Sequence, residues 1–253
     1  MKSVLFVFLF GLLPCLTFAQ FKMNDTTFLL RKVSDSIYNG YNFYHAIYFE
    51  RNKNAKEYDW IRNFGFDKYY GKNEFRRDVN ETKKYLQTEL KKIPLKGIVT
   101  KWCELKLYKD SFYMYSPSEY CENSQFEITS SLVIEKGCER TFSILDTIIK
   151  LSETHYQIKA KAISYQLHPK KYTRTINIYF INKKEGIAVI EGIFWDGKGF
   201  MLMVNAANIK HFPLIVNHCI TDKTDEFEFD KIDFDSLLKK FRTHKSATQQ
   251  KLN

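Results

Sequence analysis

Hydrophobic residues recur at two different spacings along this chain, and the spacing changes near residue 96. In residues 20–95, two sets of positions lie three or four residues apart, the spacing that places side chains on one face of a helix. The sets are Leu29, Leu30, Val33 and Ile37, then Phe75, Val79, Thr82, Leu86 and Leu90. We therefore predict a mixed, mainly helical region, whose second helix begins near Asn73 and ends before Pro94.

From residue 97 to 216, apolar and polar residues alternate, which is the pattern of strands with two different faces. The alternating sets are Val99, Cys103, Leu105 and Leu107; Phe126, Ile128, Leu132 and Ile134; and Tyr156, Ile158, Ala160 and Ala162. Residues 125–135 are interpreted as one strand, and two further strands, 172–181 and 187–195, flank the loop NKKEG. The pattern predicts about eight or nine strands, and strands joined by such short turns are antiparallel.

A meander of this many strands closes, or nearly closes, into a barrel, because closure removes exposed strand edges. The predicted fold class is α+β and β-rich: an antiparallel meander forming a lipocalin-like barrel or half-barrel, with N-terminal helices and a C-terminal helix over residues 232–243. The likeness to lipocalins is one of architecture alone. Phe234, Leu237, Leu238 and Phe241 give the last helix an apolar stripe that should pack across one end or wall of the barrel. We expect one domain, residues 20–243, followed by a polar tail, 244–253.

The first nineteen residues have the three parts of an export signal. Lys2 is the positive end, residues 4–13 are an apolar run, and Ala19 is the small residue at the cleavage position. The run is shorter than the ~20 residues that a membrane-spanning helix needs. We expect cleavage after Ala19 and a secreted or periplasmic protein with no transmembrane segment in the mature chain. A lipid anchor at Cys15 is disfavoured, because Pro14 stands where a small residue is required.

Four cysteines remain after cleavage, Cys103, Cys121, Cys138 and Cys219, an even number that suits disulfides in an oxidising compartment. If residues 125–135 are one strand, its ends lie roughly 33 Å apart, which separates Cys121 from Cys138. A disulfide needs Cα atoms within about 7 Å of each other. The pairs Cys103–Cys121 and Cys138–Cys219 are therefore favoured, with four free thiols as the alternative in a compartment that is not oxidising.

The chain is basic, with 39 Lys and Arg residues against 29 Asp and Glu residues and a net charge of +10. Only Lys2 among these charges is lost with the leader. On an exported protein, the excess favours an anionic envelope surface, such as lipid headgroups or acidic polysaccharide, over nucleic acid as a partner. A solvated surface that keeps the protein soluble by self-repulsion would have the same composition.

Motifs of known active sites are missing from the sequence: it contains no G-x-S-x-G, no P-loop and no H-E-x-x-H. No cofactor and no metal are therefore predicted. His211, His218 and Cys219 come nearest to a zinc or copper set, but adjacent strand residues point to opposite faces. The acids between Asp222 and Asp235 lack the central glycine of a hand-type calcium loop. Within them, residues 226–229 are interpreted as a strand with one wet face.

Glu191 is the most informative residue, because its carboxylate lies within the apolar run GIAVIEGIFW, where burial requires partners. With NKKEG as a hairpin loop, Glu191 is expected opposite Asn177, and Val189 opposite Tyr179. One face then carries Thr175, Asn177, Tyr179, Glu191 and Trp195, and the other carries Ile176, Ile178, Phe180, Ala188, Ile190 and Phe194. The first face resembles a ligand wall, which is mostly apolar with a few convergent polar groups. Alternatively, Glu191 is tied to a lysine or to backbone donors beneath the helices.

The expected function is non-catalytic binding of a small amphiphilic or apolar ligand in the barrel cavity. Its candidate residues are Asn177, Tyr179, Glu191 and Trp195, with Trp102 and Tyr113 as more distant ones. One alternative is an exported glycan hydrolase that uses Glu191 and Asp196 as a carboxylate pair. Another is a structural or adhesive envelope protein that uses its basic surface and the aromatic-rich segment 38–70.

Overall fold

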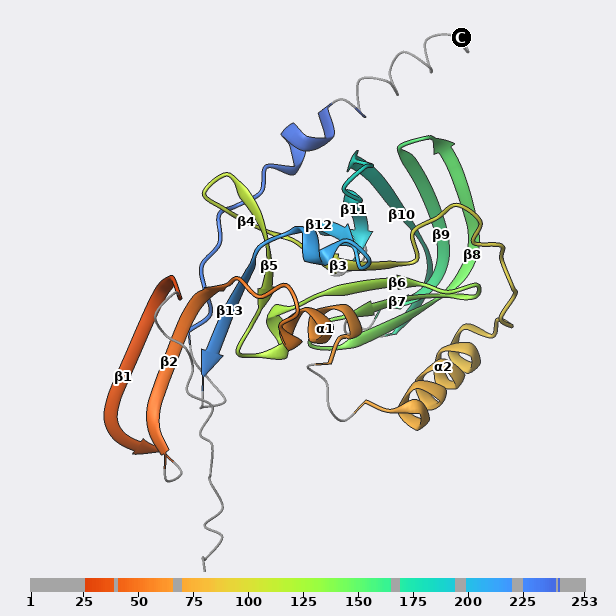
Figure 1. Cartoon of the computed structure of the whole chain (residues 1–253). Coiled ribbons are helices and arrows are strands. Elements are labelled where there is room, and N and C mark those ends of the chain that lie inside the picture. Colours follow the sequence, from red (N-terminus) through yellow and green to blue (C-terminus); the bar gives the residue numbers. More distant parts are fainter. Residues whose placement is uncertain are drawn as a thin grey trace, which may run out of the picture.

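The computed structural model describes residues 26–38, 41–65, 70–164, 169–193, 199–219, 225–239 and 241. Two β-sheets form its centre, a closed barrel and a five-stranded sheet beside it (Figure 1). The fold is β-rich α+β as predicted, and the meander closes completely rather than as a half-barrel. Among the described helices, none has an apolar stretch long enough to cross a bilayer.

The barrel wall consists of eight strands that follow one another in chain order. They are β3 (Lys101–Glu104), β6 (Gln125–Ile128), β7 (Leu132–Lys136), β8 (Arg140–Ser152), β9 (His155–Ser164), β10 (Lys170–Asn182), β11 (Ile187–Ile193) and β12 (Gly199–Asn205). Every neighbouring pair is antiparallel. The circle closes where β12 pairs with β3, so the first and last strands of the meander protect each other's edges. The sequence-based strands did not include β8.

The five-stranded sheet combines strands from distant parts of the chain. Its order is β1 (Phe28–Tyr38), β2 (Tyr41–Glu50), β13 (Leu214–Cys219), β5 (Ser111–Ser116) and β4 (Lys106–Tyr108). The β13·β5 pair is parallel and the others are antiparallel.

The helix predicted from the spacing of Leu29 to Ile37 is wrong, because these residues belong to β1. An irregularity in the β1·β2 register between Phe28 and Leu30 lets the adjacent Leu29 and Leu30 pack against one apolar cluster. Two neighbouring apolar residues therefore fit a strand here, although they resemble a helical pattern.

The described helices lie outside the two sheets. They are α1 (Lys56–Asn63), α2 (Lys72–Leu86), the short 3-10 turns η2 (Tyr120–Glu122) and η4 (Ile209–His211), and a C-terminal helix over residues 234–239. The second predicted helix is confirmed as α2, which lies against the barrel side formed by β8 and β9 (Figure 1). Val79 and Leu86 of α2 pack there against Ile134 and Ile144.

The barrel interior is a packed apolar core. Each of the eight strands contributes to one buried cluster, which comprises Trp102, Phe126, Ile128, Val133, Leu145, Tyr156, Ile158, Ala160, Ile176, Ile178, Phe180, Ala188, Ile190, Ile193 and Met203. Residues 93–99 close one end: Trp102 Nε1 donates to the Val99 carbonyl at 3.1 Å, and Tyr156 Oη donates to the Gly97 carbonyl at 3.3 Å. The described inward side chains therefore fill the space that a lipocalin-like cavity would need.

A second core joins the outer barrel wall to the five-stranded sheet. Cys103, Leu202 and Val204 of the barrel, Tyr58 and Ile61 of α1, and Ala46, Met114 and Val216 of the sheet belong to this cluster. The sheet and α1 therefore form a second layer over the barrel strands β3, β11 and β12, and the cluster includes only the end of β10, at Tyr179 and Ile181.

Residues 125–135, interpreted above as one strand, are two strands joined by a tight turn. The hairpin pairs Gln125 with Lys136 and Ile128 with Val133, and Thr129 Oγ1 in the turn accepts the Leu132 N–H at 2.9 Å. Folding back brings the Cα atoms of Cys121 and Cys138 to 4.2 Å, and these two cysteines form a disulfide. The separation of roughly 33 Å estimated for one straight strand does not apply, because the turn folds the segment back on itself.

The favoured disulfide pairs, Cys103–Cys121 and Cys138–Cys219, are consequently wrong. Cys103 is a buried thiol on β3 of the barrel, whereas Cys219 ends β13 in the other sheet.

Candidate functional site

The strand pairing predicted around Glu191 is confirmed: Asn177 pairs with Glu191 and Tyr179 with Val189. The face is the outer wall of the barrel, because Tyr179 and Val189 belong to the cluster shared with the second sheet. The alternating positions, such as Ile178 and Ile190, fill the interior.

The alternation beyond Glu191 is interrupted at Gly192. This residue has φ +87°, and a Cβ built on it would lie 2.3 Å from the Thr175 carbonyl oxygen. The register with β12 shifts at the same point, and Ile193 belongs to the interior cluster although it shares the parity of Glu191. The bulge therefore separates Glu191 from the residues that follow it in the predicted wall.

The Glu191 carboxylate is held by neutral side chains of β10. Its Oε2 accepts from Asn177 Nδ2 at 3.0 Å and from Tyr179 Oη at 2.9 Å. A carboxylate only accepts hydrogen bonds, so the Asn177 amide must point its NH2 group at Glu191. The amide oxygen of Asn177 then faces His155 Nε2 at 3.2 Å, and His155 Nε2 must be the donor of this hydrogen bond. The His155 ring also stacks on Tyr179, with centroids 4.3 Å apart. The Glu191 carboxylate is thus satisfied by hydrogen bonds within the protein. This resembles the alternative in which Glu191 is tied to a lysine or to backbone donors, except that the donors are an amide and a phenol.

The C-terminal segment, defined as residues 225–239 and 241, crosses this same outer wall. Glu191 pairs with Phe200 of β12, and the Phe200 ring stacks on Phe234 with centroids 5.6 Å apart. Farther along, Leu238 is 1% exposed and the Phe241 ring lies 5.2 Å from Tyr179. The predicted apolar stripe therefore packs on a wall of the barrel.

A groove of about 360 Å³ lies between β12 and this segment. It forms because β3 pairs with β12 only over Met203–Asn205, after which the chain leaves the barrel to enter β4. The groove is lined by Glu104, Leu105, Lys106, Leu107, Glu122, Phe200, Met201, Leu202, Phe227, Phe229, Asp230, Ile232 and Phe234.

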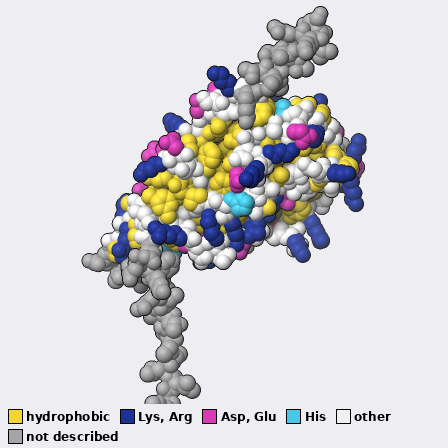
Figure 2. All heavy atoms as spheres, turned by 45° about the horizontal axis from the view of Figure 1, so that its top comes forward, with side chains coloured by type: hydrophobic (Ala, Val, Ile, Leu, Met, Phe, Trp, Pro, Cys, Tyr) yellow, Lys and Arg dark blue, Asp and Glu magenta, His cyan; other side chains and the backbone are white. Residues whose placement is uncertain are grey.

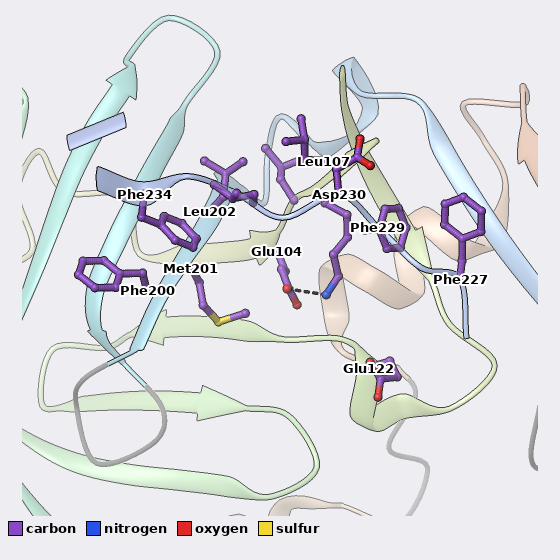
Figure 3. Close-up of a pocket in the computed structure, with 13 residues that line it drawn as sticks. Glu104, Leu107, Glu122, Phe200, Met201, Leu202, Phe227, Phe229, Asp230 and Phe234 are labelled. Carbon is purple, nitrogen blue, oxygen red and sulfur yellow. Dashed lines mark hydrogen bonds and ion pairs between the residues drawn. The ribbon is translucent and has the colours of Figure 1, made fainter. Parts of the chain in front are cut away.

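Aromatic rings stand at both ends of the groove, and charged groups lie between and below them (Figure 3). Phe200 and Phe234 mark one end, whereas Phe227 and Phe229 mark the other. Between them, Lys106 Nζ donates to Glu104 Oε1 at 2.6 Å. In the view of Figure 2, hydrophobic side chains form a band across the molecule, with charged side chains beside and within it. The site thus offers apolar surface and charged groups within one concavity.

Glu226 anchors the C-terminal segment to the five-stranded sheet. Its carboxylate accepts from Tyr115 Oη, from Asn217 Nδ2 at 2.8 Å and from the Glu119 N–H at 2.9 Å. Burial, together with the hydrogen bond to this carboxylate, raises the pKa of Tyr115 far above its ordinary value. Asn217 Oδ1 in turn faces His45 Nε2 at 2.8 Å. The residues before the groove are therefore fixed in place, and the strand expected over residues 226–229 is an extended segment rather than a strand.

A buried ion pair lies inside the barrel, and the sequence reasoning missed it. Arg174 Nη2 donates to Glu135 Oε1 at 2.6 Å and to the Gly192 carbonyl at 2.5 Å. Both side chains are nearly inaccessible, at 5% and 3% exposure. The sequence signal for it was the spacing of Arg174, which is two and four residues from the inward residues Ile176 and Ile178 and therefore lies on the same face of the strand.

Trp102 and Tyr113, the two more distant candidates, do not line the groove. Trp195 and Asp196, the second carboxylate of the hydrolase alternative, lie outside the described residues. Trp102 is in the barrel core, and Tyr113 is on β5, with its ring 5.6 Å from Phe49. Within the described part of the chain, no group of three His, Cys, Asp or Glu side chains is placed to hold a metal ion.

No protein-family model, curated protein or solved structure matches this chain. Its function is therefore argued from the geometry alone.

Proposed function

We propose that this protein is exported and binds a small amphiphilic or apolar ligand, without catalysis, in the groove between β12 and the C-terminal segment. The observation that carries the proposal is the lining of that groove, in which phenylalanine rings at both ends flank charged side chains. Ligand sites are typically concave and mostly apolar with a few placed polar groups, and their volumes begin near ~300 Å³. A small ligand with one polar end fits this description.

The location differs from the lumen expected from the sequence. Inside the barrel, the described side chains pack against one another and residues 93–99 cover one end. On the outside, residues 199–202 of β12 do not pair with β3. The C-terminal segment covers this part of the barrel wall but leaves the groove open between them. The space between β12 and the C-terminal segment supports the outer groove, rather than the lumen, as the proposed ligand site.

Export is supported by the Cys121–Cys138 disulfide, since such bonds persist in oxidising compartments. The leader that predicts export, residues 1–19, lies outside the described residues. N-terminal sequencing of the protein from its native host should find Gln20 first. A chain that retains Met1 would contradict export.

The binding proposal is tested with an apolar fluorescent probe, N-phenyl-1-naphthylamine, and with its displacement by lauric acid, dodecanol and dodecylamine. We expect saturable binding at one site per chain and displacement by at least one of the three amphiphiles. Native mass spectrometry of protein incubated with the displacing compound should show a one-to-one complex. The absence of saturable binding by all four compounds would contradict the proposal.

Two matched substitutions localise the site. Leu107→Trp places a larger side chain in the groove lining, whereas Leu151→Trp makes the same change at a residue that is 49% exposed near the end of β8. Removing groove volume should weaken probe binding roughly tenfold for Leu107→Trp, because overpacking alone costs about 1–3 kcal/mol, and leave Leu151→Trp unchanged. Equal affinities of the two variants, both shown to be folded by circular dichroism, would exclude this groove.

A further inference from the structure

The outer wall formed by β9 and β10 presents lysines on the side of the barrel that faces away from the second sheet. Lys159 pairs with Thr147 and Thr175 on its two sides, and Lys161 pairs with Ile144 and Thr173. Two positions along a strand are about 7 Å apart. Lys171 of β10 lies two residues from Thr173 on the same face, so Lys159, Lys161 and Lys171 stand close together. We call these three residues, with Thr173 and Thr175, the lysine wall.

The side chains of the lysine wall are exposed, whereas the residues between them, such as Ala160 and Arg174, point into the barrel and are buried. The positions of the lysines are therefore set by two central strands of a closed barrel rather than by a loop. Such a surface is ordered before any partner arrives, which lowers the entropy lost on binding.

The charges of this wall lack acidic partners among the described residues. Several acidic side chains elsewhere form ion pairs: Glu127 with Lys136, Glu104 with Lys106, and Glu153 with both Lys150 and Lys183. By contrast, no described carboxylate lies within ion-pair distance of Lys159, Lys161 or Lys171. The nearest acids in the register are at its border, where Asp146 is exposed beside Thr147. Three positive charges therefore stand together on this wall without an acidic partner among the described residues.

The end of α2 extends the positive surface. Lys161 Nζ reaches Thr88 Oγ1 at 3.4 Å, just after α2 ends, and Lys171 Nζ lies 5.8 Å from the Tyr85 ring. Tyr85 Oη donates to the Pro169 carbonyl at 2.6 Å, which holds the ring at the edge of the wall. Lys84 and Lys170 are exposed beside it. The result is a continuous row of ammonium groups and hydroxyls that runs from β9 across β10 to α2.

The composition of this surface discriminates between anionic partners. Proteins that lie on membranes add apolar side chains that enter the lipid, and proteins that bind single-stranded nucleic acid add several rings on which bases stack. The lysine wall instead alternates ammonium groups with threonine hydroxyls, which suit a hydroxylated and carboxylated polymer. A barrel wall is also curved, and a flexible chain can follow it where a flat bilayer cannot.

We propose that the lysine wall is a docking surface for an acidic polysaccharide, a chain of sugars that bear carboxylate groups. Lys159, Lys161 and Lys171 bind the carboxylates, and Thr173 and Thr175 bind sugar hydroxyls. Tyr85 provides a ring edge at the end of the wall. This interaction is independent of the groove, which lies between β12 and the C-terminal segment and shares no residue with the lysine wall.

The experiment uses polygalacturonate as the probe, with neutral dextran of matched length, phosphatidylglycerol vesicles and a single-stranded oligonucleotide as comparisons. Binding to the leader-free chain is measured by calorimetry at low salt and at about 0.15 M salt, where charges are screened beyond about 8 Å. We expect binding to polygalacturonate that weakens with salt, no binding to dextran, and weaker binding to the vesicles and the oligonucleotide.

Three triple variants locate the interaction. Lys159→Gln, Lys161→Gln and Lys171→Gln together should weaken polygalacturonate binding roughly tenfold or more at low salt. The corresponding triple Arg variant keeps the charge and should bind within about twofold of the parent chain. Lys32→Gln, Lys184→Gln and Lys231→Gln make the same change in net charge at exposed residues outside the wall, and should have little effect.

Four results would overturn the proposal. These are no salt-sensitive binding to polygalacturonate, equal losses in the two Gln triples, a loss in the Arg triple as large as that in the wall Gln triple, and tighter binding to vesicles or oligonucleotide. The last result would assign the wall to a different class of partner.

Discussion

The two faces of strand β10 have different surroundings although they share one backbone. Ile176 and Ile178 point into the barrel, are 0% exposed and contact other apolar side chains. Asn177 and Tyr179 point outward, where they donate hydrogen bonds to Glu191 and lie near the C-terminal segment. The inward face is filled, whereas the outward face is covered by a segment that leaves a groove beside it.

The difference shows where a closed barrel of this kind can bind a ligand. Inward side chains large enough to fill the lumen stabilise the barrel by burying apolar area, and the same side chains exclude a guest. In the described part of the chain, the groove lies where a second layer covers the outer wall and the two surfaces do not match completely. Substitutions on the inward face should therefore change stability, and substitutions on the outward face should change binding.

The largest effect is expected from Arg174→Met, which removes one partner of the inward ion pair. Glu135 would then be a buried charge without its guanidinium, a change that typically costs about 3–5 kcal/mol. Urea unfolding followed by tryptophan fluorescence measures the free energy of unfolding. The double variant Arg174→Met with Glu135→Leu should recover most of the loss. A loss below about 1 kcal/mol for the single variant would show that the pair is not isolated from water.

The inward apolar face is tested with Ile178→Ala. This residue is 0% exposed in the barrel core, so the truncation leaves a cavity and should lower the free energy of unfolding by about 2–5 kcal/mol. Probe affinity in the groove should not change in the folded protein. An increase in stoichiometry, with a second probe bound per chain, would show that the lumen can accept a ligand.

Loss of the Cys121–Cys138 disulfide should lower stability by about 3 kcal/mol, because it closes a loop with a sequence separation of 17 residues. The double variant Cys121→Ser with Cys138→Ser avoids new thiol pairings. Its stability should be insensitive to dithiothreitol, whereas the parent chain should lose stability on reduction. Mass mapping of peptides under non-reducing conditions would contradict the assignment if Cys103 or Cys219 were found in the bridge instead.

A smaller effect is expected on the outward face. Tyr179→Phe removes one hydrogen bond to the half-buried Glu191 and should lower the free energy of unfolding by about 1 kcal/mol. Glu191→Gln should cost a similar amount, and the double variant should cost less than the sum, because both changes remove the same contact. Strict additivity would show that the two side chains are not coupled.

The smallest effect at neutral pH concerns Cys103, whose pKa burial raises to about 11. The thiol is therefore protonated at neutral pH in both the folded and the unfolded chain. Its contribution to stability is complete below the ordinary pKa of 9.0 and is lost as the pH rises towards about 11, because the unfolded chain releases the proton first. Iodoacetamide at pH 8 should not label Cys103 in the native protein and should label it in urea. Rapid native labelling would place this thiol at the surface.

Much of the barrel was predictable because its signals are local. Alternation marks the strands, and the position of the loop NKKEG predicts the pairing of Asn177 with Glu191, although the register shifts between Phe180 and Asn182 beside the loop. Alternation separates two faces but does not say which one is inside. Both faces of β10 carry apolar residues, so the choice of Glu191 as a lumen residue had no physical basis in the strand itself.

The groove and the packing of the C-terminal segment could not be predicted, because they depend on contacts between distant parts of the chain. Phe234 meets Phe200, and Glu226 meets Tyr115, only after two sheets have been assembled. The groove exists because of these contacts, and no short segment encodes it. A local signal was missed at one place: Asn39-Gly40 stands between the paired residues Tyr38 and Tyr41, and this dipeptide between strand-like sequences is typical of a hairpin.

The pairing of β12 with β3 also determines when the fold can form during synthesis. Strand β3 is synthesised about a hundred residues before its barrel partner β12. The separation in sequence between β2 and its partner β13 is longer still. The barrel has open strand edges until residue 205 has emerged, and β2 lacks its partner until residue 219 has emerged. Such edges could pair with another chain. Any product that stops short of that point is therefore an aggregation hazard, so the cell must protect the nascent chain or deliver it complete.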